Sequence, residues 1–239
     1  MRQIEKGAAP RELRQWFEGQ PIVDGRRINC TYEQGLPTEI KDTIRRRLLA
    51  EQGGLCCYTG LRIDLSSSHI EHLKPQNQCH DHEDVDYNNM LAAYPLKKSG
   101  ERGCPYGAHA KVGWYSPDLF IGPLTKQCET SFRFDLEGRV FPADNGNRAA
   151  VETIRRLRLD HHSLAEMREQ AIEEVFFTKN RRLSEAQLRT LAERGFCSKD
   201  EQGRYPLFCF VIQQAAEQLL RKAARERARR QALGDRGRS

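Results

Sequence analysis

The sequence contains no run of about 18 apolar residues, the length that a membrane-spanning helix needs. Residues 1–6 also lack the apolar core of a secretory signal. These two absences argue against a membrane protein and predict a cytoplasmic location. Disulfides are rare in that compartment, so we expect the eight cysteines to be thiols or metal ligands. No internal repeat is present.

Apolar residues are scarce for a globular chain. Hydrophobic residues make up 38% of the 239 positions and charged residues 30%, a polar balance that is still not typical of disorder. The formal net charge is +6 and the sequence pI is about 8.9. This modest basic excess suits a nucleic-acid partner, although a solvated charged surface explains the same value. The length allows one large domain or two small ones.

The most informative stretch is residues 68–75 (SHIEHLKP). Its apolar–polar alternation predicts a short strand that ends by Pro75, because proline cannot donate to a strand ladder. Glu71 and His72 then lie near the strand end, where a twist or bulge can turn both towards one site. A carboxylate for a hard cation beside an imidazole for a proton suits metal-assisted phosphodiester hydrolysis. A strand edge with solvated polar residues fits the same pattern.

The rest of the chain is mostly helical in pattern. Ile40, Ile44 and Leu48 recur at helical spacing after Thr38, a candidate N-cap. Capping-box patterns open two later helices, at residues 163–166 and 184–187. The predicted helices are 12–17, 40–52, 87–94 (capped by Asp86 or Asn88), 150–157, 163–178, 184–195 and 207–233; the predicted hairpins are 55–73, with a turn at 66–68, and 132–141, with a turn at 137–138; the predicted loops are 76–86 and 95–113.

The end of the last predicted helix is strongly basic. Between residues 221 and 230 there are six basic residues against one acid, Glu226. A frayed, solvated helix is the ordinary explanation, and contact with nucleic acid or an acidic partner is the more specific one.

Four segments occur in an informative order: 56–60 (CCYTG), 71–75 (EHLKP), 86–91 (DYNNML) and 104–111 (CPYGAHAK). Together they resemble the HNH endonucleases, whose ββα-metal fold places a hairpin against a helix around one divalent cation. The closer resemblance is to the PtuB-like HNH subunit of the Septu anti-phage defence system, which also occurs as a retron accessory effector. The likeness extends to residues 1–6, 128–134 with Gly138, and 153–168.

The resemblance implies an α+β, mostly helical chain. Its parts would be an N-terminal extension (1–37), an HNH nuclease core (38–146) and a C-terminal helical region (147–239). Residues 95–103 would be a loop insertion in the core, because Asn89 and His109 are farther apart than is usual for HNH proteins.

The resemblance also assigns roles to individual residues. His72 would be the general base, and Glu71 a ligand for Mg²⁺ or Mn²⁺. Asn89 would hold the loop, orient His72 or help with the metal, and Asn88 is the alternative for that position. An ordinary helix cap also explains Asn89. His109 would be a second metal ligand, or a loop histidine without a role.

Two lysines and two cysteines complete the candidate site. Lys74 and Lys111 are expected to contact nucleic-acid phosphate. Many HNH proteins bind a structural zinc through paired Cys-x-x-Cys motifs, but residue 59 is Thr and residue 107 is Gly. We therefore expect no zinc cofactor, with Cys56 and Cys104 as the residues that a zinc site would use.

The partners that the resemblance implies are a DNA or RNA substrate and a PtuA-like ATPase subunit, together with a retron reverse transcriptase and its RNA/DNA where the chain serves a retron. No membrane partner is expected. The alternative is a non-catalytic nucleic-acid-binding or adaptor module built on a degenerate HNH core. Thr59 and the long insertion favour that alternative.

Overall fold

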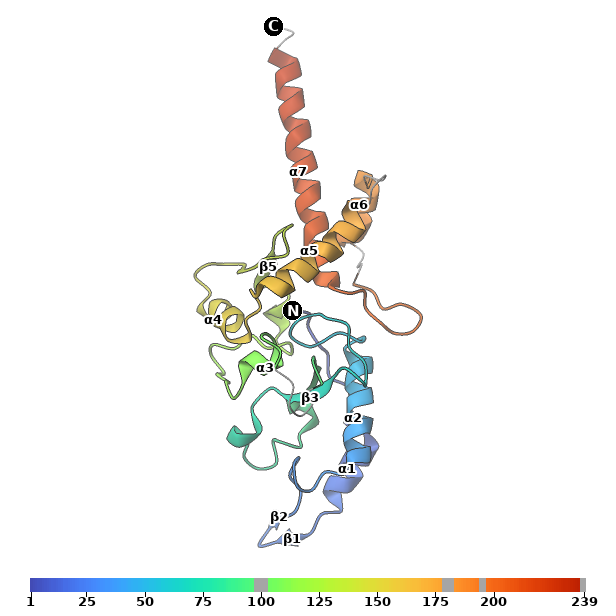
Figure 1. Cartoon of the computed structure of the whole chain (residues 1–239), viewed down its shortest axis with the longest axis vertical. Helices are drawn as coiled ribbons and strands as arrows, with labels where there is room; N and C mark the ends of the chain where they lie inside the picture. Colours follow the sequence, from blue (N-terminus) through green and yellow to red (C-terminus); the bar gives the residue numbers. More distant parts are fainter. Residues whose placement is uncertain (97–102, 178–182, 194–196, 237–239) are drawn as a thin grey trace.

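The computed structural model describes residues 1–96, 103–177, 183–193 and 197–236, and it shows an α+β chain with small two-stranded antiparallel sheets (Figure 1). The α-helices are α1 (Arg11–Glu18), α2 (Thr38–Glu51), α3 (Ala108–Lys111), α4 (Arg148–Leu157), α5 (His162–Phe176), α6 (Glu185–Glu193) and α7 (Cys209–Arg236). The strand pairs are β1 (Ile22–Val23) with β2 (Arg26–Arg27), β3 (His69–His72) with β4 (Met90–Ala93), and β5 (Phe132–Phe134) with β6 (Val140–Pro142). None of the described helices is both long and apolar enough to cross a membrane.

The elements follow one another along the long axis of the molecule. The α1, β1 and β2 segment lies at one end, α2 and β3 lie near the middle, and α7 extends from the other end (Figure 1). One buried apolar cluster includes Met1, Leu48 and Val211, so it draws side chains from all three predicted parts of the chain. The division at residues 37 and 146 stays a prediction.

The predicted pairing of the Glu71–His72 strand was wrong. β3 pairs with β4, in the register His69↔Ala93 to His72↔Met90, and not with residues 61–63. A single bridge, Leu55↔Arg62, stands where the hairpin was expected. The helix predicted at 87–94 was also wrong, since a 3₁₀ turn (Tyr87–Asn89) leads into β4. All four β4 residues are fully buried, and such a short apolar run has no alternation that distinguishes a strand from a helix.

Several other boundaries can be compared with the structure. The hairpin predicted at 132–141 is confirmed as β5–β6, and the start of α6 is capped reciprocally by Ser184 and Gln187 as predicted. The other capping box was wrong, because the His161 ring accepts from the Ser163 N–H and α5 begins one residue earlier. Thr38 is the first residue of α2 and not its N-cap, which is Pro37. Predicted residues 97–102, 178 and 194–195 lie outside the described ranges.

α5 is fastened to the β5–β6 turn by a buried arginine. The Arg168 Nη1 donates to the carbonyls of Gly138, at 3.2 Å, and Leu159, at 3.0 Å, and its guanidinium lies over the Phe134 ring. Burial lowers the pKa of Arg168 to about 10. Gly138 has φ +72°, and a Cβ there would lie 2.2 Å from the Ala165 carbonyl oxygen, so only glycine fits this contact. The residue types at 138 and 168 thus fix the helical region against the core.

α2 positions β4 through one buried side chain. The Gln52 amide donates to the carbonyls of Leu55 and Ala92, each at 2.8 Å, and its Oε1 accepts from the Ala92 N–H at 2.7 Å. The Ala92 carbonyl also accepts from the Cys57 N–H at 3.1 Å, so it is the Ala92 N–H that would be left without a partner in the interior if Gln52 were removed.

We predict that Gln52→Ala destabilises the fold by roughly 2–3 kcal/mol, because it removes the side-chain partner of the buried Ala92 N–H and of the Leu55 carbonyl. Chemical denaturation measures the change. Gln34→Ala, which alters an exposed glutamine, is the matched control and should change the stability by less than about 0.5 kcal/mol. Equal stability of the two variants would contradict this account of Ala92.

Candidate functional site

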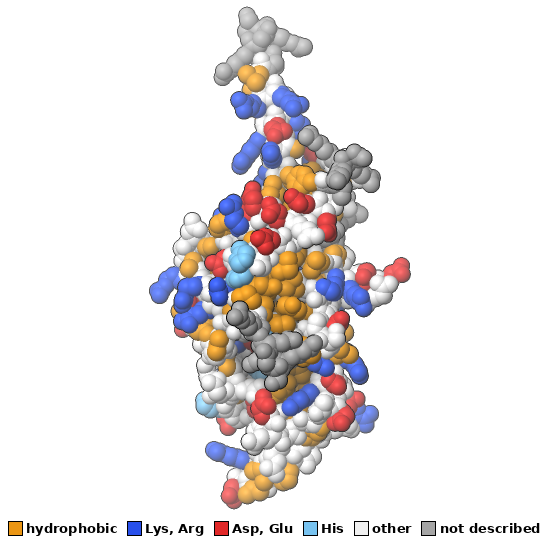
Figure 2. Space-filling view, in the orientation of Figure 1, with side chains coloured by type: hydrophobic (Ala, Val, Ile, Leu, Met, Phe, Trp, Pro, Cys, Tyr) orange, Lys and Arg blue, Asp and Glu red, His pale blue; other side chains and the backbone are white. Residues whose placement is uncertain are grey.

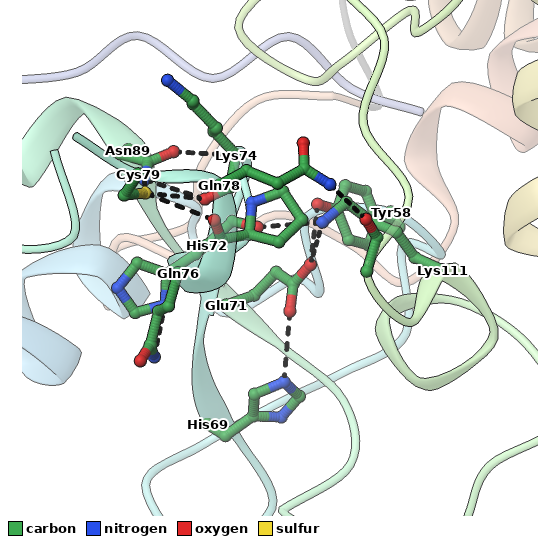
Figure 3. A network of polar contacts seen from close by, with 12 residues as sticks. Tyr58, His69, Glu71, His72, Lys74, Gln76, Gln78, Cys79, Asn89 and Lys111 are labelled. Carbon is green, nitrogen blue, oxygen red and sulfur yellow. Dashed lines mark hydrogen bonds and ion pairs between the residues drawn. The ribbon is translucent and has the colours of Figure 1, made fainter. Parts of the chain in front are cut away.

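The candidate site lies along β3 and the loop that follows it (Figure 3). The β3–β4 register is regular, with Glu71 opposite Leu91 and His72 opposite Met90. Neighbouring strand residues point to opposite faces, and Figure 3 shows the His72 ring turned towards Gln76 while the Glu71 carboxylate is turned towards Lys111. The predicted bulge that would turn both side chains the same way is therefore not observed at these paired positions.

Glu71 is a buried carboxylate with several partners. Its Oε1 accepts from the Lys111 Nζ at 2.9 Å and from the Tyr58 hydroxyl at 3.2 Å. Its Oε2 lies 3.7 Å from the His69 Nε2. Burial alone would raise the pKa of Glu71, but the His69 contact and the Lys111 charge outweigh it and leave that pKa below 4.5. Glu71 is therefore ionised at neutral pH.

His72 is held so that one ring nitrogen is basic. Its Nε2 lies 2.8 Å from the Asp84 carbonyl oxygen, which can only accept, so Nε2 carries the proton. Nδ1 then holds the lone pair and accepts from the Gln76 amide at 3.2 Å. Burial lowers the pKa of His72 below 6.5 against the opposing effect of the Asp84 carbonyl. The neutral ring is the form present at pH 7.

The extension at the N-terminus contributes one aromatic residue to this side of β3. The Tyr32 ring packs edge-on against the His72 ring, with centroids 4.6 Å apart. The Tyr32 N–H also donates to the Asp84 carboxylate at 2.7 Å. Tyr32 thus restrains the imidazole and the segment that supplies its carbonyl partner.

Asn89 fastens the loop between β3 and β4. Its Oδ1 accepts from the Lys74 N–H at 2.8 Å, and its Nδ2 donates to the carbonyls of Lys74 and Glu83, each at 3.0 Å. Since Glu83 precedes Asp84, Asn89 also fixes the carbonyl that orients His72. Of the roles predicted for Asn89, the structure shows the one that holds the loop. Asn88 is exposed, and within the described part of the chain its hydrogen bonds go to the Asp86 carboxylate.

His109 lies on α3, and its Nδ1 accepts from the Cys104 N–H at 2.9 Å. Its ring neighbours that of His69, with centroids 5.7 Å apart. His69 was missed by the sequence analysis, although its position two residues before Glu71 on a strand places both side chains on one face. The Nδ1 of His69 lies 2.7 Å from the Pro95 carbonyl oxygen, so it carries a proton and leaves Nε2 facing Glu71.

Lys111 and Lys74 differ in their exposure to solvent. Lys111 was predicted to contact phosphate, but it is only 2% exposed and its Nζ binds Glu71 and, at 2.9 Å, the His72 carbonyl oxygen. Lys111 is buried because its side chain extends from α3 back towards β3, where it is enclosed. Lys74 is partly exposed and forms an ion pair with Glu83. Lys74 remains the lysine that solvent can reach.

The donor set can be tested against a divalent cation. Across the described ranges, no group of three or more His, Cys, Asp or Glu side chains is placed to hold a metal ion. Mg²⁺ commonly binds one or two protein groups and completes its shell with water and phosphate oxygens. Glu71 Oε2 fits one such ligand. His69 Nε2 fits a second only when the ring is neutral, because burial is outweighed by the Glu71 contact and the pKa of His69 is raised towards the doubly protonated ring, which has no lone pair for a metal. The Lys111 charge on the other carboxylate oxygen opposes cation binding. The His109 ring lies beside that of His69, with centroids 5.7 Å apart.

Cys56 and Cys104, the cysteines that a zinc site would use, have different hydrogen-bond partners. The Cys56 thiol is buried and accepts from the Tyr94 N–H at 3.3 Å. Cys104 is half-buried, and its N–H is the donor to His109. The described cysteines are free thiols.

No protein-family model matches this chain, and no curated protein matches it.

We predict that Asn89→Ala destabilises the protein by about 2–3 kcal/mol, because it leaves the Glu83 carbonyl and the Lys74 backbone without their partner. Asn88→Ala, one residue away and exposed, is the control and should cost less than about 0.5 kcal/mol. Thermal and chemical unfolding measure both. The reverse order of effects would assign the loop anchor to Asn88.

Lys111→Met should destabilise the fold by about 3–5 kcal/mol at pH 7, because it leaves the Glu71 carboxylate buried and without its cation. The folded-state pKa of Glu71 is lowered from 4.5, so the pair stabilises the fold above about pH 4.5, and this contribution is lost as the pH falls through the lowered pKa. The destabilisation should therefore shrink in acid. Urea denaturation at pH 7 and pH 4 tests this.

The double variant Glu71→Gln/Lys111→Met is the control for the lysine prediction. It removes both charges and should be more stable at pH 7 than Lys111→Met alone. Equal stability of the single and double variants at pH 7 would show that an unpaired carboxylate is not the cause.

Proposed function

We propose that this chain is a metal-dependent HNH-type endonuclease that hydrolyses phosphodiester bonds. β3, β4 and α3 follow one another in the chain, and Lys111 on α3 reaches back to Glu71 and to the His72 carbonyl. This succession of two antiparallel strands and a helix supports the resemblance to the ββα-metal fold. Glu71 and His72 lie at the end of the β3 strand, whereas Asn89 lies in the 3₁₀ turn before β4 and not in a helix.

The observation that carries the proposal is the orientation of His72. A histidine whose Nε2–H donates to a backbone carbonyl has a fixed tautomer and a basic Nδ1. Burial keeps its pKa below 6.5, so the base is neutral at cellular pH. These are the two properties that a general base needs to activate water.

The reaction can be written from these groups. His72 Nδ1 takes a proton from water as the water oxygen forms a new bond to phosphorus, and the bond between phosphorus and the leaving oxygen breaks. The Gln76 amide, 3.2 Å from Nδ1, stands where that water would be held. For water to reach Nδ1, the Gln76 side chain would move away from the ring, or its amide would donate its hydrogen bond to the water instead. Asn89 acts through the loop that supplies the Asp84 carbonyl.

Mg²⁺ or Mn²⁺ held by Glu71 with His69, and with His109 as the further nitrogen, would stabilise charge on the phosphate and the leaving oxygen. Lys74 is the partly exposed cation beside the loop and is the candidate for a phosphate contact. The substrate is DNA or RNA.

The biological setting that we propose follows from the resemblance to the PtuB-like HNH subunit. The chain would be the effector nuclease of a Septu-type or retron-type anti-phage system in the cytoplasm. It would work with a PtuA-like ATPase subunit and, in a retron, with the reverse transcriptase and its RNA/DNA.

A second candidate function is a non-catalytic nucleic-acid-binding or adaptor module. One observation favours it: the reactive groups are already satisfied by protein partners. Lys111 and Tyr58 occupy one oxygen of Glu71, and Gln76 contacts the basic nitrogen of His72. An inactive core would keep such contacts for stability alone.

We predict that His72→Ala lowers metal-dependent cleavage by about 100-fold or more and leaves nucleic-acid binding unchanged. The wild-type rate should be on a plateau at pH 7 and should fall as the pH drops below 6.5 through the lowered pKa of His72, because protonation removes the base. Single-turnover cleavage of labelled DNA and RNA over pH 5–8 measures both effects.

His162→Ala is the control for this prediction, since His162 is an exposed histidine at the start of α5. It should retain both the wild-type rate and its pH profile. Unchanged cleavage in His72→Ala would remove the nuclease assignment, and binding without any cleavage in the wild type would favour the non-catalytic module.

A further inference from the structure

The second half of α7 projects away from the rest of the molecule (Figure 1). The first half packs against α6, α5 and β5. From residue 221 to 233 every side chain is exposed except Ala223, which is half-buried. We call residues 221–233 the α7 arm. At about 1.5 Å per residue, the arm is roughly 20 Å long.

The arm holds most of the net charge of the protein. It carries six basic side chains and one acidic side chain, Glu226, so its net charge is +5 against +6 for the whole chain. The basic residues are Arg221, Lys222, Arg225, Arg227, Arg229 and Arg230. Figure 2 shows Lys and Arg side chains spread along this projecting part. The basic excess is therefore a local feature of one helix and not a property of the whole surface.

Four of the basic residues form a stripe along the arm. Lys222, Arg225 and Arg229 are spaced i, i+3 and i+7, and Arg221 is one turn before Arg225, so these four share one side of the helix. Arg227 lies on another side, where it forms an ion pair with Glu185 of α6. The stripe thus points away from the helix that supports the arm.

The stripe is poorly neutralised. Arg221 pairs with Glu217, but Lys222, Arg225 and Arg229 have no ion pair among the residues that the structure describes. Four like charges on one exposed helix face repel one another and are destabilising unless an anion is bound. An evenly spaced polyanion would relieve that repulsion.

The composition of the arm indicates which polyanion fits. Apart from alanines, its only apolar residue is Leu233, so the arm has no apolar face for a protein partner. It also has no aromatic residue on which an unpaired base could stack, as single-strand binders require. The stripe from residue 221 to 229 is about 12 Å long, which matches about three phosphates along one strand of a duplex.

We propose that the α7 arm is a binding site for the phosphate backbone of a double-helical nucleic acid. The inference deepens the proposed function, because it assigns duplex binding to a helix separate from the residues that would cut. It gives the chain a sequence-independent hold on its substrate.

The test is equilibrium binding of full-length protein to fluorescent 30-base-pair DNA and RNA duplexes, over a series of salt concentrations and in the presence of EDTA. The variant Lys222→Gln/Arg225→Gln/Arg229→Gln should bind about 10- to 100-fold more weakly at 0.1 M salt. It should also flatten the slope of log affinity against log salt by about 2–3, since each lost phosphate contact removes about 0.9. Glu226→Gln should bind more tightly than the wild type.

The matched control is Arg11→Gln/Arg14→Gln/Arg26→Gln, which removes three exposed charges at the opposite end of the molecule. It lowers the net charge equally and should leave the salt slope within about 1 of the wild type. Glutamine is a good helix former, and circular dichroism confirms that α7 persists. The DNA and RNA arms of the experiment show which duplex is preferred.

An unchanged salt slope in the α7 variant, or an equal loss in the control, would overturn the inference and leave an acidic protein as the partner of the arm. This result is distinguishable from failure of the proposed function. Binding in EDTA does not need the His72 chemistry, so His72→Ala should keep the wild-type affinity and salt slope in the same assay.

Discussion

The candidate site depends on the contacts that the buried ammonium group of Lys111 makes. It joins α3 to β3 by binding both the Glu71 carboxylate and the His72 carbonyl oxygen. A buried carboxylate and a buried ammonium are each costly alone, and they persist because each satisfies the other and because Tyr58 and the backbone complete the network. The same contact decides the chemistry. It keeps Glu71 ionised in the interior and occupies one of its oxygens, so that only the second oxygen, facing His69, is left for a cation.

On the other face of β3, His72 is held by a hydrogen-bonded loop and not by a charge pair. Asn89 ties the loop together, the fixed loop presents the Asp84 carbonyl, and that carbonyl sets the tautomer of His72. Tyr32 packs against the ring from the N-terminal extension. Each step converts a flexible polar group into an oriented one, which is the requirement for a general base. The regular strand register turns the His72 and Glu71 side chains to opposite faces of β3, and Lys111 links the two residues by binding the Glu71 carboxylate and the His72 carbonyl.

The exposed charges of the α7 arm are arranged differently from the buried charges of the candidate site. The buried charges of Glu71 and Lys111 are paired, whereas the charges of the α7 arm are exposed, and Lys222, Arg225 and Arg229 have no ion pair among the described residues. Long-range attraction to a polyanion needs exposed charge, and orientation of reactive groups needs buried, satisfied contacts. The chain separates the two requirements in space, with the reactive residues near the middle of the molecule and the arm at one end (Figure 1).

The sequence by itself determined the elements whose signals are local. The amphipathic pattern of residues 40–52 and the alternation of Phe132 and Phe134 identified a helix and a hairpin, and the alternation ending at Pro75 identified β3. Glu71 and His72 were chosen because a carboxylate beside an imidazole suits one chemistry, and Asn89 was chosen only from the resemblance to HNH endonucleases. The charge of the α7 arm was also legible in the sequence.

Only the tertiary structure decided which strand pairs with β3, and where each polar side chain finds its partner. Residues 90–93 are all buried, so they lack the alternation of apolar and polar residues that marks a strand, and the sequence predicts a helix there. Tyr58 contacts Glu71 across 13 residues of chain, and Lys111, which was expected at the surface, contacts Glu71 from the interior across 40 residues. Such contacts depend on how elements pack, and packing leaves no periodic trace in the sequence because any residue of the right size and polarity can meet it.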